Sequence, residues 1–202
     1  GVPIAAPSAN ISGRPSPTSA EHCRDDMDGR VDIILDGGVC SFGLESTIVK
    51  PNGRGGLKLL RPGAITPDDL RTVCEDVEID CAVFSKFTGT PEAPGMKYRH
   101  YAPDARVIIL DGSDSQVYSF LEDKQDCGIL CYSEDKPLLG YRNVSVIGSR
   151  YSPAEQAHLL FKCLREFKGV DTIYARMPSD GGVGLAVYNR LVKAAGYEIL
   201  KL

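Results

Sequence analysis

Short apolar runs alternate with helix-forming stretches throughout the second half of this 202-residue chain. The runs that we expect to form strands lie at residues 106–110, 128–132, 144–147 and 172–175. Strands that alternate with helices along the chain build a sheet with helices on both of its faces. The sequence therefore predicts an α/β fold, with a three-layer unit over residues 105–202.

One helix of this unit is marked by Ser152-Pro153-Ala154-Glu155, the pattern of a capping box. His158 in that helix lies off its apolar face, so we expect a solvated side chain. Gly181-Gly182-Val183-Gly184 opens a last helix that runs to Gly196, and either a nucleotide site or a plain turn explains these glycines. The helix that follows Ser152 should have one apolar face, formed by Ala157, Leu160, Phe161, Leu164 and Phe167.

The first half of the chain predicts a second, smaller unit over residues 1–79. Thr18-Ser19-Ala20-Glu21 has the capping-box pattern, with Thr18 as the N-cap, and predicts a short helix ending near Gly29. Thr66-Pro67-Asp68-Asp69 combines an N-cap with a proline at the first helical position. It predicts a helix over residues 67–75. Strands are expected at residues 31–35, 46–50 and 57–61.

Residues 80–104 form the predicted linker, because hydrophobic periodicity fades there and glycines and prolines punctuate the chain. Two tyrosines, two cations and a histidine are packed into five positions near its end: Lys97, Tyr98, Arg99, His100 and Tyr101. Such rings can stack on a base while the cations meet phosphate. The rings can equally pin the linker onto both units, and both interpretations stay open.

Residues 5–18 are suited to bind an anion. Ser8, Asn10 and Ser16 offer short polar side chains just before a helix N-terminus, where backbone amides carry partial positive charge. The alternative is that Ser8 and Asn10 only cap turns. The residues by themselves do not decide, because no Walker-type lysine accompanies them.

Two further segments are candidates for ligand contact. In the glycine-rich connection over residues 36–47 the backbone can approach a ligand closely, and Ser46 can grip a small polar substrate. A hairpin with an exposed turn is the alternative there. Arg61 ends an apolar strand, where it can pair with phosphate or carboxylate, or remain a plain surface side chain.

Charge and cysteine usage exclude several classes. The net charge is -4, and no broad cluster of Lys and Arg predicts a nucleic-acid-binding surface. No apolar run approaches the ~20 residues that cross a bilayer. The seven cysteines lack a C-x-x-C pair and zinc-ligand spacing. We therefore expect reduced thiols, no metal site and a cytoplasmic protein.

Several motifs also occur together in a fixed order: Pro3-Ile4-Ala5-Ala6-Pro7-Ser8-Ala9-Asn10, Ser12-Gly13, Ser16-Pro17-Thr18, Gly43-Leu44-Glu45-Ser46-Thr47, Leu60-Arg61-Pro62-Gly63 and Pro94-Gly95-Met96-Lys97-Tyr98-Arg99-His100-Tyr101-Ala102-Pro103. Together they resemble the threonylcarbamoyl-AMP synthase family, the YrdC-like proteins, in its longer two-domain form. Tyr188-Asn189-Arg190-Leu191 with Ala194-Ala195 resembles the end of that form's accessory domain. The resemblance implies the C-terminal part of a YrdC-like twisted-sheet α/β domain over residues 1–79. A linker clamping the active site (80–104) and a small Rossmann-like three-layer domain (105–202) would follow it.

The resemblance implies an enzyme that joins L-threonine, bicarbonate and ATP into threonylcarbamoyl-AMP and pyrophosphate, helped by Mg²⁺. The product would pass to a tRNA threonylcarbamoyl-transfer complex that modifies the adenosine beside the anticodon. Tyr101 would close over the nucleotide, and Ala6 and Ser46 match threonine-contacting positions. The positions that match ATP contacts are Ser8, Asn10, Ser16, Arg61 and Tyr101.

One departure from the family concerns the start of the chain. Family members begin the synthase domain with a segment that carries a lysine and an arginine for the triphosphate, and this sequence begins after it. We therefore expect these 202 residues alone to be inactive. The alternatives are a non-catalytic nucleotide-binding module and a module with weak RNA binding.

Overall fold

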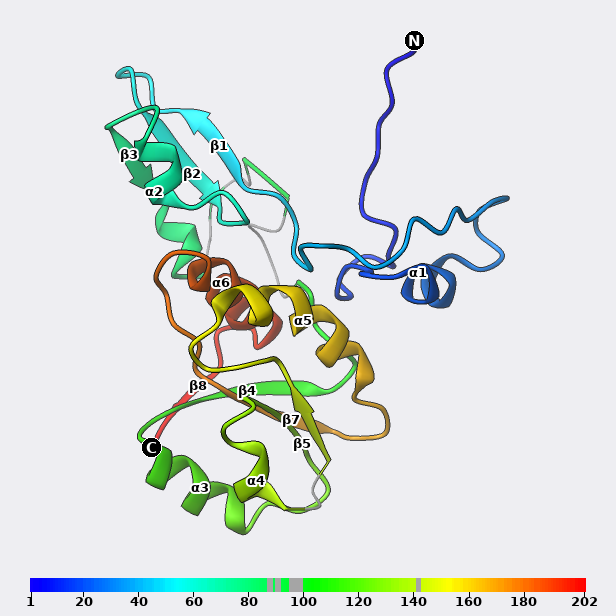
Figure 1. Ribbon diagram of the computed structural model, residues 1–202, viewed down its shortest axis with the longest axis vertical. Coiled ribbons are helices and arrows are strands. Elements are labelled where there is room, and N and C mark those ends of the chain that lie inside the picture. Colours follow the sequence, from blue (N-terminus) through cyan, green and yellow to red (C-terminus); the bar gives the residue numbers. More distant parts are fainter. Residues whose placement is uncertain (87–88, 90–91, 95–99, 141–142) are drawn as a thin grey trace.

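A computed structural model describes residues 1–86, 89, 92–94, 100–140 and 143–202, and Figure 1 shows how they are arranged. The strands are β1 (Ile48–Pro51), β2 (Leu57–Arg61), β3 (Val77–Ile79), β4 (Arg106–Asp111), β5 (Gly128–Cys131), β6 (Val144–Val146), β7 (Thr172–Arg176) and β8 (Ile199–Lys201). The helices are α1 (Ala20–Met27), α2 (Pro67–Arg71), η1 (Cys81–Val83, a 3-10 helix), α3 (Asp114–Glu122), α4 (Lys136–Leu139), α5 (Pro153–Glu166) and α6 (Gly184–Ala194). The predicted α/β fold is confirmed.

The five strands from β4 onward form one parallel sheet in the order β6-β5-β7-β4-β8. Helices α5 and α6 cover one face of this sheet, and α3 and α4 cover the other (Figure 1). All four residues of β5 are buried, as a strand between two helical layers requires. The predicted strands at 106–110, 128–132, 144–147 and 172–175 are confirmed as β4, β5, β6 and β7, with ends that differ by one residue.

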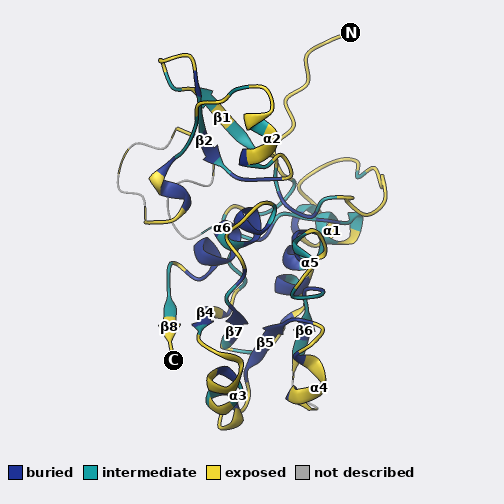
Figure 2. Ribbon diagram, turned by 60° about the vertical axis from the view of Figure 1, so that its left-hand side comes forward, coloured by how far each residue is buried: buried dark blue, intermediate teal, exposed yellow. Residues whose placement is uncertain are grey.

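Each face of this sheet has its own hydrophobic core. The apolar stripe of α5 is buried as predicted, with Leu160, Phe161 and Leu164 fully enclosed against the sheet and α6. Val117 and Leu121 of α3 form the opposite core. The buried residues of α5 and α6 are dark blue in the view coloured by burial (Figure 2).

The remaining strands form a three-stranded sheet in which β1 pairs antiparallel with β2, and β2 pairs parallel with β3. Leu185 at the start of α6 packs against Leu59 of β2 and Val83 of η1. Helix α6 therefore lies between the two sheets and contacts both (Figures 1 and 2).

Several local expectations need correction. Helix α1 is capped by Ser19, which accepts a hydrogen bond from the His22 amide, and not by Thr18, whose side chain is buried. The helix expected at 67–75 forms as α2 but ends at Arg71. His158 is half-buried rather than solvated, since its Nδ1 lies 3.2 Å from the Ser41 carbonyl oxygen.

Residues 31–35 do not form the expected strand. The structure shows no pairing partner for them in the described chain, and Ile33 and Leu35 are 75% and 89% exposed. Without a neighbouring strand, the backbone N–H and C=O groups of an apolar run cannot form the hydrogen bonds of a sheet. The hairpin alternative for residues 36–47 is therefore wrong as well. Strands β3 and β8, which carry no strong apolar alternation, were not expected.

None of the helices in the described parts of the chain combines the length and apolar character that crossing a membrane requires.

Candidate functional site

One cavity of about 260 Å³ is lined by all five residues that the resemblance matches to ATP contacts. These residues come from three separate parts of the chain: the loop before α1, the end of β2, and the segment that enters β4. The lining consists of Ser8, Asn10, Ser12, Gly13, Arg14, Ser16, Glu45, Arg61, Pro94, His100 and Tyr101.

Arg61 is held in place at the carboxyl end of β2 by two contacts with Ser46. Its Nε donates to the Ser46 carbonyl oxygen at 2.9 Å, and its Nη2 donates to the Ser46 Oγ at 3.2 Å. It also donates a hydrogen bond to the Tyr101 hydroxyl. Burial, and then the positive charge of Arg190, lower the pKa of Arg61 from its ordinary value. A guanidinium next to another cation favours an anion in the cavity.

Glu45 connects the loop before α1 to helix α6. Its Oε1 accepts a 2.5 Å hydrogen bond from the Ser16 hydroxyl, and its Oε2 accepts one from Arg190 Nε at 2.7 Å. Burial by itself would raise the pKa of this carboxyl, but the charge of Arg190 and the hydrogen bonds from Ser16 and Arg190 outweigh it. The pKa of Glu45 is therefore lowered, and the group stays ionised at neutral pH.

Tyr101 lies where the chain passes from residue 100 into β4. Its backbone φ of 63° is in the left-handed region, which a non-glycine residue adopts only when its surroundings hold it there. The ring stacks on Phe161 of α5 at 5.3 Å between centroids, and the Arg190 guanidinium lies 5.3 Å from its centre. Burial raises the pKa of this phenol, which stays protonated.

Asn10 does cap its own turn, because its Nδ2 donates to the carbonyl oxygens of Ile11 and Arg14. Its Oδ1, however, is buried and has no hydrogen-bond partner among the described residues. Buried polar atoms are nearly always satisfied. A donor on a ligand in the cavity would satisfy this one.

The two residues matched to threonine contacts do not line this cavity. Ser46 lies next to it, through its hydrogen bonds with Arg61. Ala6 belongs to the exposed N-terminal segment, which extends away from the other elements (Figures 1 and 2). The structure therefore brings the five ATP candidates together and leaves Ala6 apart. Of the aromatic and basic cluster at the end of the linker, Lys97, Tyr98 and Arg99 lie outside the described residues.

Sequence reasoning missed Glu45, which lines the cavity, and Arg190, which pairs with it. Both were inside quoted motifs, but neither was given a role. Arg190 carried a detectable signal, because an arginine in the middle of an otherwise apolar helix must be either exposed or fully paired. In the structure it is fully buried.

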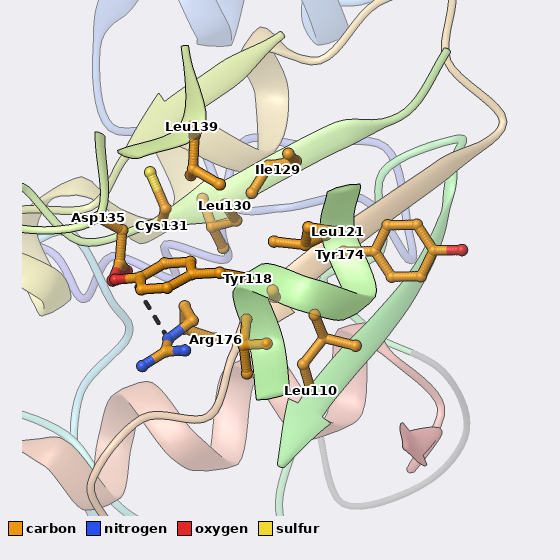
Figure 3. Close-up of a pocket in the computed structure, with 12 residues that line it drawn as sticks. Leu110, Tyr118, Leu121, Ile129, Leu130, Cys131, Asp135, Leu139, Tyr174 and Arg176 are labelled. Carbon is orange, nitrogen blue, oxygen red and sulfur yellow. Dashed lines mark hydrogen bonds and ion pairs between the residues drawn. The ribbon is translucent and has the colours of Figure 1, made fainter. Parts of the chain in front are cut away.

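The glycines at 181–184 form a turn before α6 and do not line the cavity. A Cβ at Gly184 would lie 2.2 Å from the Ser179 hydroxyl, so close packing explains that glycine. A second pocket, between α3 and the sheet, is filled by apolar side chains and leaves no room for water (Figure 3). Arg176 at its edge forms ion pairs with Asp114 and Asp135, while its Nη1 is buried without a hydrogen-bond partner among the described residues.

The described residues do not fit a protein-held magnesium ion. They contain no group of three or more His, Cys, Asp or Glu that could hold a metal. The carboxylate in the cavity, Glu45, is already engaged by Arg190 and Ser16. Mg²⁺ usually binds through one or two carboxylates together with substrate phosphates.

Family profiles match nearly the whole chain. A profile described as "Threonylcarbamoyl-AMP synthase, C-terminal domain" matches residues 65–196, and one described as "Telomere recombination" matches residues 1–63. The threonylcarbamoyl-AMP synthase of Pyrococcus abyssi is 42% identical over 213 residues, covering 99% of this chain and 60% of the relative. The Bacillus subtilis protein of the same name is 40% identical over 207 residues, covering 100% of this chain and 59% of the relative.

A solved structure agrees with these matches. The crystal structure of P. abyssi Sua5 complexed with L-threonine superposes with a TM-score of 0.83 and 40% identity, covering 97% of this chain and 58% of that one. The chain thus spans about 60% of the length of the curated relatives that it matches. Sequence and fold agree, and the chain belongs to the threonylcarbamoyl-AMP synthase family.

Proposed function

We propose that this protein is an L-threonylcarbamoyladenylate synthase, which converts L-threonine, bicarbonate and ATP into threonylcarbamoyl-AMP and pyrophosphate. The observation that carries the proposal is the cavity in which Ser8, Asn10, Ser16, Arg61 and Tyr101 converge from distant parts of a chain of this family. Relatives with the same name and the threonine-bound neighbour support the substrate class.

ATP would enter the cavity with its phosphates toward Arg61, because a guanidinium binds phosphate through two parallel hydrogen bonds. The Ser8 hydroxyl would donate to a phosphate oxygen. The Ser16 hydroxyl donates its proton to Glu45, so its oxygen would accept from a hydroxyl or amino group of the nucleotide. The free Oδ1 of Asn10 accepts from a ribose hydroxyl or the adenine amino group. Tyr101 covers the nucleotide and keeps water from it.

In the proposed reaction the amino nitrogen of threonine first forms a bond to the bicarbonate carbon, a C–O bond of bicarbonate breaks, and water leaves, which gives a carbamate. An oxygen of this carbamate then forms a bond to the α-phosphorus of ATP, while the bond to the bridging oxygen breaks and pyrophosphate leaves. Such a displacement needs mainly alignment and neutralisation of charge, which Arg61 supplies at the α-phosphate. Ser46, hydrogen-bonded to Arg61, and Ala6 are proposed to contact threonine.

The wider setting follows from the same proposal. Residues 1–79 would be the C-terminal part of the synthase domain, 80–104 the clamping linker, and 105–202 the accessory domain. The product is proposed to pass to a tRNA threonylcarbamoyl-transfer complex. The proposed location is the cytoplasm, because the proposed pathway uses both ATP and tRNA.

The test is pyrophosphate release by the protein purified at its full natural length. Release should require ATP, L-threonine and bicarbonate together. Arg61→Ala should lower kcat/KM about 100-fold, the usual effect of losing one charge-stabilising donor. Arg54→Ala is the control, because Arg54 lies on the β1–β2 connection with 71% of its side chain exposed and forms a salt bridge with Glu78. Its kcat/KM should match that of the wild type.

A protein that binds ATP but shows no threonine-dependent release would contradict the proposal and would favour a non-catalytic nucleotide-binding module. Salt-dependent tRNA binding without any turnover would instead favour the RNA-binding module.

A further inference from the structure

Arg190 on α6 is fully buried, yet its contacts reach three separate segments of the nucleotide cavity. Its Nε binds the Glu45 carboxylate at 2.7 Å, and its Nη2 donates to the Pro62 carbonyl oxygen at 3.0 Å. Its guanidinium also lies 5.3 Å from the centre of the Tyr101 ring. The segments it joins are the one entering β1, the one leaving β2 and the one entering β4.

The geometry points to Arg190 as a positioning residue for the ATP site. Helix α6 of the five-stranded unit would thereby help to build a site whose ligand contacts lie mostly in the first half of the chain. Arg190 pairs with Glu45, which accepts from Ser16, and it lies against the ring of Tyr101, which is hydrogen-bonded to Arg61. Two of the five proposed ATP contacts thereby depend on one side chain that does not itself line the cavity. The identity of the ligand as ATP rests on the function proposed above.

The arginine is itself held rigidly. Its Nη1 donates to Asn189 Oδ1 at 2.9 Å, and Asn189 Nδ2 donates to the Val83 carbonyl oxygen at 2.8 Å. A buried guanidinium is tolerated only when its donors are satisfied. Because the partners of Arg190 lie in different segments, no single segment can shift without breaking one of these contacts.

Arg176 provides a matched comparison in the same unit. Its side chain is 9% exposed, and it pairs with Asp114 and Asp135 at the edge of the pocket in Figure 3. None of these three residues lines the nucleotide cavity. Losing Arg176 should therefore cost stability as losing Arg190 does, without moving Ser16 or Tyr101.

The experiment measures ATP affinity by calorimetry, the melting temperature Tm, and the KM for ATP and kcat of the full-length protein. Arg190→Met should lower Tm and weaken ATP binding by about tenfold or more, with a larger change in KM than in kcat. Arg176→Met should lower Tm and leave ATP binding at the wild-type value.

The double variant Glu45→Gln with Arg190→Met guards against a single variant that fails to fold. It removes the buried carboxylate that Arg190→Met would leave without its cation, so Tm should recover in part. ATP binding should stay weak, because Ser16 and Tyr101 are still unsupported. A purely structural role for Arg190 predicts that Tm and ATP affinity recover together.

The inference is overturned if Arg190→Met binds ATP as the wild type does, or if Arg176→Met weakens ATP binding equally. The proposed synthase activity fails by a different result, an absence of threonine-dependent pyrophosphate release from a wild-type protein that binds ATP. That result would leave the comparison of ATP affinities between the two arginine variants valid.

Discussion

Lys193 lies almost one turn after Arg190 on α6 and is only 3% exposed. Burial, followed by the positive charges of Arg190 and Arg61, lowers its pKa from 10.5 to about 8. The charged lysine is thus disfavoured in the folded protein. The positive charges of Arg61, Arg190 and Lys193 thus lie close enough to one another to favour negative charge in this part of the molecule.

We predict that Lys193→Met raises the free energy of unfolding at pH 7 by up to about 3 kcal/mol, the equivalent of the pKa difference. The folded state binds fewer protons here than the unfolded state between pH 8 and 10.5. The penalty is therefore full below about pH 8 and disappears as the pH rises past 10.5. Urea unfolding of both proteins at several pH values measures it.

The comparison is made between the two proteins at each pH, because burial also raises the pKa of Cys131 and Tyr132 to about 12. Those groups weaken the fold at alkaline pH in both proteins and cancel in the difference. A stability difference that stays constant from pH 7 to 11 would contradict the prediction.

Gly43 sets the distance between the segment carrying Glu45 and helix α5. A Cβ at this position would lie 2.2 Å from the backbone carbonyl oxygen of His158. The neighbouring Leu44 is buried in the core formed with α5 and α6. The glycine is thus required by a close approach of two backbones.

We expect Gly43→Ala to push this segment away from α5, at a cost of about 1–3 kcal/mol in the free energy of unfolding. Because Glu45 follows two residues later, ATP binding should weaken as well. Thermal unfolding and calorimetric titration with ATP measure both effects. Gly37→Ala is the control, since no atom lies within 4 Å of its Cβ position. Equal behaviour of the two variants would refute this account of Gly43.

The helical stretches illustrate what local patterns can predict. The caps of α2, α3 and α5 are formed by Thr66, Ser113 and Ser152, each accepting a backbone N–H within three residues. Such interactions depend only on nearby residues. The strand expected at 31–35 failed because strand formation needs a partner from elsewhere in the chain.

Across the whole molecule, Arg165 of α5 joins the five-stranded unit to the loop before α1. Its Nη2 binds the Asp26 carboxylate at 2.6 Å, and its Nε donates to the Pro15 carbonyl oxygen at 3.1 Å. Burial would raise the pKa of Asp26, but hydrogen bonds from Arg165 and Arg14 outweigh it and lower the pKa. The carboxylate side chain is completely buried. Because Ser16 follows Pro15, this contact also supports the cavity.

Arg165→Met should lower the free energy of unfolding by about 3–5 kcal/mol, because it leaves a buried carboxylate without its main cation. The wild type should lose this contribution as the pH falls below about 4, through the lowered pKa of Asp26. Urea unfolding between pH 7 and 3 gives both values. Lys162→Ala, which removes an exposed pair with Glu166, should change stability by less than about 1 kcal/mol. A similar small change in Arg165→Met would contradict the prediction.

Sequence by itself determined the α/β fold, the strands β4 to β7 and the positions of most helices. These features follow from hydrophobic periodicity and capping residues, which are local properties of the chain. The motifs around Ser8, Ser16, Arg61 and Tyr101 also identified the family and the residues that line one cavity.

Tertiary structure alone decided how these residues cooperate. Glu45 and Arg190 are 145 positions apart in the sequence, and Arg165 and Pro15 are 150 apart. Neither pair shows any local pattern, because a contact of this kind exists only after α5 and α6 have packed against the segments of the first half of the chain. The physical reason is burial, since an ion pair that would be weak at the surface becomes decisive where no water can replace either partner.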